Sequence, residues 1–195
     1  MTTDYDVIVI GGGQSGLAAT HRLRGLTVAL LEADAEPVGS WPHYYDSLTL
    51  FSPAKYSSLP GFSFPGAPDR YPHRDEVVDY LRGYAARLDA DIHTNCRVDA
   101  VDHDGYAFTA HTGTGATFRA PRLIAATGSF RTPSIPTLPG QDRFTGKILH
   151  ASNYRTPAEF AGQQVTVVGA GNSAVQIAAE LADHTTTTLA SRNLV

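Results

Sequence analysis

Several classes of protein are excluded by what this sequence of 195 residues lacks. Its single cysteine, Cys96, excludes a disulfide scaffold, a cysteine-based metal site and a redox-active cysteine pair within the chain. The formal net charge of −4 offers no basic surface to nucleic acid. No apolar run is longer than a strand, so we expect no membrane span. A first strand that begins near Asp4 leaves no room for a signal peptide, and we therefore expect a cytoplasmic protein.

Glycine, by contrast, is frequent, and it occurs in two turns of the same design. Residues 11–16 (GGGQSG) follow an apolar strand expected at residues 6–10. Residues 169–174 (GAGNSA) follow a second such strand, expected at residues 165–168. A helix is expected to begin within each turn, over residues 14–24 and 172–182. One such turn indicates a nucleotide site, and two in one chain indicate a flavin and a nicotinamide handled by one enzyme.

The residue types in both turns suit a pyrophosphate. The first glycine lets the chain reverse sharply from strand to helix. The second has no side chain, so the ligand can approach the backbone, and the third position must be small because helix and strand cross closely there. The helix N-terminus then offers N–H groups and a partial positive charge to the phosphates.

The two units differ where their second strand ends. In the first unit a strand expected at residues 27–31 is followed by Glu32, whose carboxylate could accept hydrogen bonds from ribose hydroxyls. In the second unit we expect Ala190 to occupy the equivalent position, followed by Ser191 and Arg192. A guanidinium in place of a carboxylate would accept a 2′-phosphate and suits NADPH better than NADH.

The chain between the turns carries fewer specific patterns. Residues 33–72 are irregular and rich in aromatics, which indicates either a functional loop or a packed surface loop. Apolar residues at helical spacing predict a helix over residues 75–88. Next comes an antiparallel insert of three or four short strands, near residues 91–94, 97–102, 106–111 and 116–119. A buried strand at residues 123–126 then ends at Thr127 and Gly128, where the glycine either admits a cofactor or only ends the strand.

The segment just ahead of the second turn carries the most specific pattern. By local physics its histidine is more typical of a structural hydrogen-bonding residue than of a catalyst. Phe144, Gly146, His150 and Tyr154, however, match the pattern F-x-G-x-x-x-H-x-x-x-Y/F. With the two turns, the whole chain resembles the N-terminal portion of the flavin-containing monooxygenases, which are FAD- and NADPH-dependent class B flavoprotein monooxygenases. Related Baeyer–Villiger enzymes usually carry tryptophan at the position of Tyr154, which argues against them.

The resemblance implies the following cofactor contacts. FAD would be bound by Gly11, Gly13, Gln14, Ser15, Gly16, Glu32, Gly39, Ser40, Trp41, Val98, Thr127 and Gly128. NADPH would be bound by Gly169, Gly171, Asn172, Ser173, Ala174, Ser191 and Arg192. Ser52 and His150 are candidate catalytic residues. Ser52 stands where many family members place an asparagine near the flavin, and a hydroxyl cannot position two groups as an amide does.

The implied fold is an α/β flavoprotein with two dinucleotide-binding domains. A Rossmann-like FAD domain with an antiparallel β insert would cover residues 1–132, a linker residues 133–160, and the start of a Rossmann-like NADPH domain residues 161–195. A mononucleotide-binding half normally contains three strands, and the second unit has room for two. We therefore expect a fragment of a longer protein. Four apolar residues of the second unit would then be partly exposed or lean on the first domain: Val165, Val167, Leu189 and Leu194.

The resemblance also implies an activity. NADPH would reduce FAD, and a flavin hydroperoxide would oxygenate a small nucleophilic N- or S-containing substrate with dioxygen. The alternatives are an NADPH-dependent flavin reductase that does not oxygenate, and a catalytically silent cofactor-binding fragment. No nucleic-acid or membrane partner is implied, and a homodimer is one possibility for the full-length form.

Overall fold

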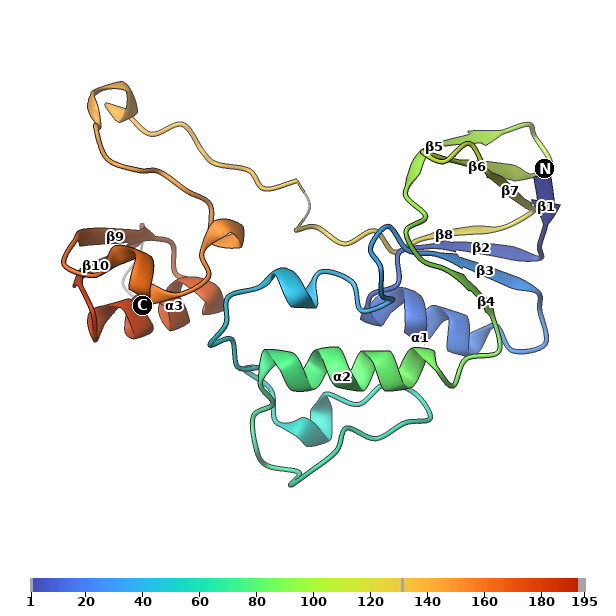
Figure 1. Cartoon of the computed structure of the whole chain (residues 1–195), viewed down its shortest axis with the longest axis horizontal. Coiled ribbons are helices and arrows are strands. Elements are labelled where there is room, and N and C mark those ends of the chain that lie inside the picture. Colours follow the sequence, from blue (N-terminus) through green and yellow to red (C-terminus); the bar gives the residue numbers. More distant parts are fainter. Residues whose placement is uncertain (1, 131, 193–195) are drawn as a thin grey trace.

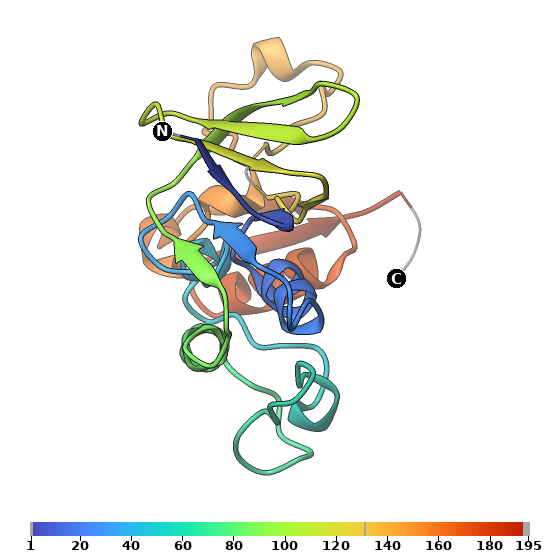
Figure 2. The ribbon, with the colours of Figure 1, turned by 90° about the vertical axis from the view of Figure 1, so that its right-hand side faces the viewer.

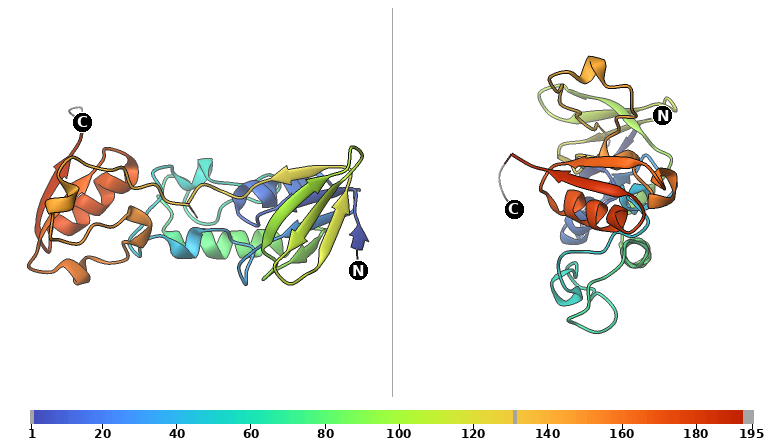
Figure 3. Two further views of the ribbon diagram at one scale, coloured as in Figure 1. Left: turned by 90° about the horizontal axis from the view of Figure 1, so that it is seen from above. Right: turned by 90° about the vertical axis from the view of Figure 1, so that its left-hand side faces the viewer.

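The computed structural model describes residues 2–130 and 132–192. Two units lie at opposite ends of an elongated molecule and are joined by an extended linker (Figures 1 and 3). The first unit (residues 2–126) contains two sheets with α1 and α2, and the second (residues 154–190) contains β9, α3 and β10. No helix in the described ranges is long and apolar enough to cross a bilayer. The domain boundaries expected near residues 132 and 160 stay predictions.

The first unit is built on a parallel sheet with the strand order β4-β3-β2-β8. The bounds are Val7–Ile10 for β2, Val28–Leu31 for β3, Asp91–His93 for β4 and Leu123–Ala125 for β8. This is the strand order of a doubly wound nucleotide-binding half, as the first glycine turn predicts. Strands β2 and β3 are apolar throughout because both faces of the sheet are covered.

The two faces of this sheet have different covers, which form successive layers in Figures 1 and 2. The helices are α1 (Gln14–Arg22) and α2 (Arg74–Ala85), and both end earlier than the sequence predicts. They cover one face, where Val9 and Leu30 are buried. Ile8 and Leu31 point the other way because strand side chains alternate, and they pack in one cluster with Phe118 of the second sheet.

The second sheet has the order β1-β7-β6-β5. Its strands are β1 (Thr2–Asp4), β5 (Val98–His103), β6 (Phe108–Thr112) and β7 (Thr117–Ala120). Strands β5, β6 and β7 are antiparallel, as expected for the insert. The assignment of residues 91–94 to this insert is wrong, since β4 pairs in parallel with β3. It follows helix α2, and a strand that returns through a helix joins the sheet in parallel.

The second unit is a parallel strand pair with one helix. Its elements are β9 (Gln164–Val168), α3 (Asn172–Ala182) and β10 (Thr186–Ala190), so the helix has the predicted bounds. Val165 and Val167 are half-buried and pack against a cluster that includes Tyr45 of the first unit, and Leu189 is exposed. The predicted partial exposure of these three residues is confirmed, while Leu194 lies outside the described residues.

Short 3-10 helices occupy the loops and the linker. They are η1 (Trp41–His43), η2 (Ala54–Tyr56), η3 (Gln141–Arg143), η4 (Ala151–Asn153) and η5 (Pro157–Phe160). The linker itself is exposed along residues 132–139. Contacts other than those of the linker must therefore set how the second unit is held.

Candidate dinucleotide-binding sites

The first glycine turn has the geometry that its sequence predicts. Gly11 has a φ of +106°, which side-chain-bearing residues rarely adopt, and a Cβ there would overlap with the carbonyl oxygen of Ala126. A Cβ on Gly16 would overlap with the carbonyl oxygen of Gly11, because helix α1 crosses strand β2 at that point. A Cβ on Gly13 would come no closer than 3.5 Å, to Cα of Gly39. The fold therefore requires Gly11 and Gly16, whereas at Gly13 a Cβ would make only an ordinary contact, and the missing side chain lets a ligand approach the backbone.

Glu32 is buried beside this turn, with 4% of its surface exposed. Its Oε2 accepts a hydrogen bond from the N–H of Gly12 at 2.6 Å, and its Oε1 accepts one from the N–H of Asp34 at 2.9 Å. A buried charge needs such partners. The carboxylate thus stands at the end of β3, adjacent to the turn, where the sequence places it.

A second segment of the predicted FAD set crosses the turn. Gly39 has a φ of +61°, and a Cβ on it would lie 2.7 Å from Cα of Gly13. Close to this crossing, the indole Nε1 of Trp41 donates a hydrogen bond to Oε1 of Gln14 at 2.8 Å. The structure therefore brings Gly39 and Trp41 together with the turn at Gly13 and Gln14. Ser40 lies between the two contacts, and Ser15 is exposed in the first turn of α1.

The remaining predicted FAD residues approach from other strands. Thr127 follows β8, and its Cα would lie 3.4 Å from a Cβ on Gly11. Gly128, next along the chain, has a φ of +70° and open space around its Cα. Val98 begins β5 and packs against the core between the sheets, shortly after Cys96, whose N–H donates to the carbonyl oxygen of Glu32 at 2.8 Å.

The second turn repeats the first in its backbone. Gly169 has a φ of +136°, and its N–H donates to the carbonyl oxygen of Ala190 at 2.9 Å. The N–H of Gly11 donates in the same way to Leu31 at 2.8 Å. A Cβ on Gly171 would meet no described atom within 4 Å, so this position leaves open space.

These equivalent bonds correct the predicted alignment of the two units. Val168 pairs with Ala190 as Ile10 pairs with Leu31, so Ala190 corresponds to Leu31. The residue equivalent to Glu32 is therefore Ser191. The prediction assumed that the same number of residues separates the glycine turn from this position in both units. Helix α3 has 11 residues and α1 has 9, and the equivalent position in the second unit lies one residue later than this count gives. The second unit still has no carboxylate at this position, and Arg192 follows at once.

Helices α1 and α3 begin in the two glycine turns, and their N-termini lack the side-chain capping that is present at the N-terminus of α2. At the N-terminus of α2, His73 accepts a hydrogen bond from a backbone N–H while its own N–H donates to Glu76 at 2.8 Å. Among the described residues, no side chain caps α1 at Gly13 or α3 at Gly171. The first N–H groups of α1 and α3 are consequently available to an anion.

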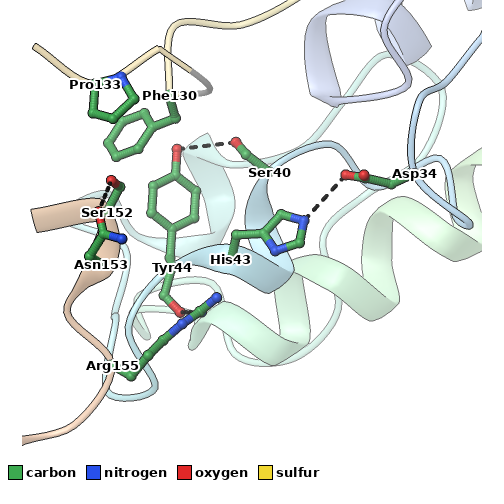
Figure 4. Close-up of a pocket in the computed structure, with 9 residues that line it drawn as sticks. All are labelled: Asp34, Ser40, His43, Tyr44, Phe130, Pro133, Ser152, Asn153 and Arg155. Atoms are coloured by element: carbon green, nitrogen blue, oxygen red, sulfur yellow. Dashed lines mark hydrogen bonds and ion pairs between the residues drawn. The ribbon is translucent and has the colours of Figure 1, made fainter. Parts of the chain in front are cut away.

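A cleft of about 480 Å³ lies next to the first turn, between loop 34–44 and the linker (Figure 4). It is lined by Asp34, Ser40, His43, Tyr44, Phe130, Pro133, Ser152, Asn153 and Arg155. The rings of Tyr44 and Phe130 meet edge to face with centroids 4.6 Å apart, and Nε2 of His43 lies 3.3 Å from Oδ2 of Asp34. Of these residues, the sequence predicted only Ser40 as part of a site. The aromatic residues of the long loop were the signal that could have indicated the cleft.

The two candidate catalytic residues make local hydrogen bonds. The hydroxyl of Ser52 lies 3.1 Å from that of Ser57, within the loop before α2. Nδ1 of His150 accepts from the N–H of Ser152 at 3.1 Å and so caps η4. Their catalytic roles stay predictions.

Two parallel strand–turn–helix units, each with an uncapped glycine turn, define the fold of a two-dinucleotide-domain flavoprotein. A family model described as pyridine nucleotide-disulphide oxidoreductase matches residues 8–194, and the chain belongs to this family. Because Cys96 is the chain's one cysteine, the chain itself holds no cysteine pair.

Similar proteins agree with the expected resemblance. A CzcO-like uncharacterized oxidoreductase of Geobacillus kaustophilus (strain HTA426) is 38% identical over 182 residues, covering 91% of this chain and 51% of that protein. The indole-3-pyruvate monooxygenase YUCCA1 of Oryza sativa subsp. japonica is 34% identical over 182 residues, covering 91% and 45%. The structure of a flavin-containing monooxygenase from Stenotrophomonas maltophilia superimposes with a TM-score of 0.93 at 40% identity, covering 98% and 58%.

The chain thus spans about half the length of the curated relatives that it matches. The predicted similarity to the N-terminal portion of the flavin-containing monooxygenases is confirmed by these comparisons.

Proposed function

We propose that this chain carries the two cofactor sites of an FAD- and NADPH-dependent monooxygenase. The observation that carries the proposal is the pair of uncapped glycine turns, which differ in the residues at the end of the neighbouring strand. Glu32 stands beside the first turn, and Ser191 and Arg192 stand beside the second. The similarity to monooxygenases of known structure supports the same conclusion.

The residues of the first turn fit FAD. Gly13 leaves space for a pyrophosphate, and the first N–H groups of α1 face that space without a capping side chain. The buried carboxylate of Glu32 would accept hydrogen bonds from the ribose. Trp41, which holds the side chain of Gln14, would lie along the ligand.

The residues of the second turn fit NADPH. Gly171 leaves equivalent space, and Arg192 would supply charge to a 2′-phosphate. FAD, when bound, supplies the acceptance of hydride and the activation of dioxygen, and the protein positions and shields it. The proposed substrate is a small nucleophilic compound that contains nitrogen or sulfur.

The test uses the full-length protein with FAD, NADPH and air, offered small amines and thioethers. The measurement is oxygenated product and hydrogen peroxide formed per NADPH consumed. Product in proportion to NADPH supports the proposal. Peroxide in place of product with every substrate would contradict it and favour a flavin reductase. A protein that retains neither cofactor would make the chain a silent remnant.

A further inference from the structure

The amide side chain of Gln176 joins helix α3 of the second unit to a loop of the first. Oε1 of Gln176 accepts hydrogen bonds from the hydroxyl of Tyr45 at 3.0 Å and from the N–H of Thr49 at 3.4 Å. Its Nε2 donates to the carbonyl oxygen of Thr49 at 3.0 Å. The amide therefore pairs with both backbone groups of one residue, as a neighbouring strand would, and this two-point contact fixes direction as well as distance.

The contact is partly shielded from water. Tyr45 is 3% exposed and packs in one cluster with Ile177 and Leu181 of α3. Burial raises the pKa of the Tyr45 hydroxyl, so this hydroxyl stays neutral and can donate to Gln176. It also accepts a hydrogen bond from Ser173, which belongs to the second glycine turn. One tyrosine of the first unit thus reaches both the middle of α3 and the turn at its start.

The loop that carries Tyr45 is itself held firmly on the first unit. Nη1 of Arg74, at the start of α2, donates to the carbonyl oxygen of Tyr44 and to Oδ1 of Asp46, each at 2.7 Å. The backbone N–H of Arg74 donates to the carbonyl oxygen of Leu48 at 2.8 Å, and the N–H of Leu50 donates to the carbonyl oxygen of Pro72 at 2.8 Å. A continuous path of hydrogen bonds therefore runs from α2 through loop 44–50 to α3.

The linker does not provide an equivalent constraint. Residues 132–139 are exposed, and three prolines in this stretch make it stiff but do not attach it to either unit. Arg155, near the start of the second unit, makes two bonds to loop 44–50: its Nη1 donates to the carbonyl oxygen of Tyr44 at 2.6 Å, and its carbonyl oxygen accepts from the N–H of Asp46 at 3.0 Å. These bonds hold the start of the unit, whereas Gln176 holds the middle of α3.

We propose that Gln176, with Tyr45, is a positioning residue that fixes the second dinucleotide-binding unit at one angle on loop 44–50. This inference rests on the proposed function: the fixed angle would direct a nicotinamide bound at the second turn toward a flavin bound at the first. Gln176 would touch neither cofactor. Its removal should leave both cofactors bound but let the units rotate against each other, which lowers the fraction of molecules in a geometry suited to hydride transfer.

The first measurement needs no cofactor. Spin labels would be placed on cysteines introduced at the exposed positions Tyr106 and Asp183 of the full-length protein, since Cys96 is buried and labels poorly. Gln176→Ala should broaden the distribution of distances between the labels. Gln163→Ala is the matched control, because Gln163 bonds Glu159 within its own part of the chain. An unchanged distribution in Gln176→Ala would overturn the inference.

The second measurement separates positioning from binding. In Gln176→Ala we expect the rate constant of flavin reduction at saturating NADPH to fall by roughly ten-fold, with the dissociation constants of both cofactors changed by less than about two-fold. Tyr45→Phe, which keeps the packed ring, guards against a folding defect and should show the same effect more weakly. A loss confined to NADPH affinity would contradict the inference. If the parent protein binds no cofactor, the proposed function fails, while the label distances still decide the role of Gln176.

Discussion

The backbone N–H of Gly12 donates a hydrogen bond of 2.6 Å to Oε2 of Glu32, which joins the first glycine turn to the end of the neighbouring strand. The carboxylate is buried and also accepts from the N–H of Asp34. A carboxylate has about four lone-pair positions, so it can accept from several donors at once, and a ribose hydroxyl is a donor of the type it accepts. One side chain can therefore shape the turn and contact the ligand that the turn holds.

The first prediction follows from this double role. Glu32→Gln keeps the size of the side chain but removes its charge and turns one end into a donor that faces a backbone N–H. We expect a loss of about 1–2 kcal/mol in FAD binding, or roughly ten-fold in dissociation constant, because bonds to charged acceptors are the stronger ones. Fluorescence titration with FAD measures it. Glu36→Gln, which affects an exposed ion pair with Arg82, is the control and should bind FAD normally.

The second prediction compares two glycines of one turn. Gly13 has φ −77° and ψ −176°, an ordinary extended conformation, and its Cβ would make an ordinary contact of 3.5 Å with Cα of Gly39. Gly13→Val should therefore fold, with a far smaller loss of stability than Gly16→Val, and lose FAD, since its methyl groups would occupy the space expected for pyrophosphate. Gly16→Val should fail to fold, because its Cβ would overlap with Gly11. Full FAD content in a folded Gly13→Val protein would refute the assignment of this turn.

Local patterns were enough to predict both turns and the parallel strands that flank them. The bounds of α3 and the position of Glu32 follow from apolar spacing and from glycine at fixed intervals, which act within a few residues. The shift from Ala190 to Ser191 was missed because strand register depends on the length of the intervening helix. A count that assumes the same number of residues between turn and strand end in both units cannot detect a shift of one residue in register.

Long-range pairing accounts for the other differences. Strand β1 (Thr2–Asp4) is polar and shows no apolar alternation, yet it pairs with β7 more than a hundred residues away. Strand β4 is short and mixes apolar with polar residues, as the insert strands do, and its position after α2 is what distinguishes it. The cleft lined by Tyr44 and Phe130 likewise joins two segments that are far apart in sequence.

The third prediction concerns the charge beside the second turn. Arg192→Ala in the full-length protein should raise the Michaelis constant for NADPH by about ten- to hundred-fold, since a charge-assisted contact to phosphate contributes roughly 1.5–3 kcal/mol. The constant for NADH should change little, because NADH has no 2′-phosphate. Steady-state kinetics with both nucleotides measure this. Arg143→Ala, in the exposed linker helix η3, serves as the control. Equal effects on both nucleotides would show that Arg192 does not read the phosphate.

The fourth prediction tests the corrected alignment of the two units. Because Ser191 corresponds to Glu32, Ser191→Glu should place a carboxylate beside the ribose of the second nucleotide. There it would repel a 2′-phosphate and accept bonds from the free hydroxyls of NADH. We expect the ratio of kcat/KM for NADPH over NADH to fall by at least about ten-fold, which corresponds to roughly 1.4 kcal/mol.

Ala190→Glu is the matched control for this change. Ala190 is the last residue of β10, and side chains of consecutive strand residues point to opposite faces, so a carboxylate at 190 would point away from the site of one at 191. This variant should leave the nucleotide preference intact, whatever it does to stability. The opposite result, a nucleotide preference changed by Ala190→Glu and unaffected by Ser191→Glu, would contradict the corrected alignment. It would mean that Ala190 corresponds to Glu32, as the residue count gives, and that the hydrogen bond from Gly169 to Ala190 does not mark the equivalent position.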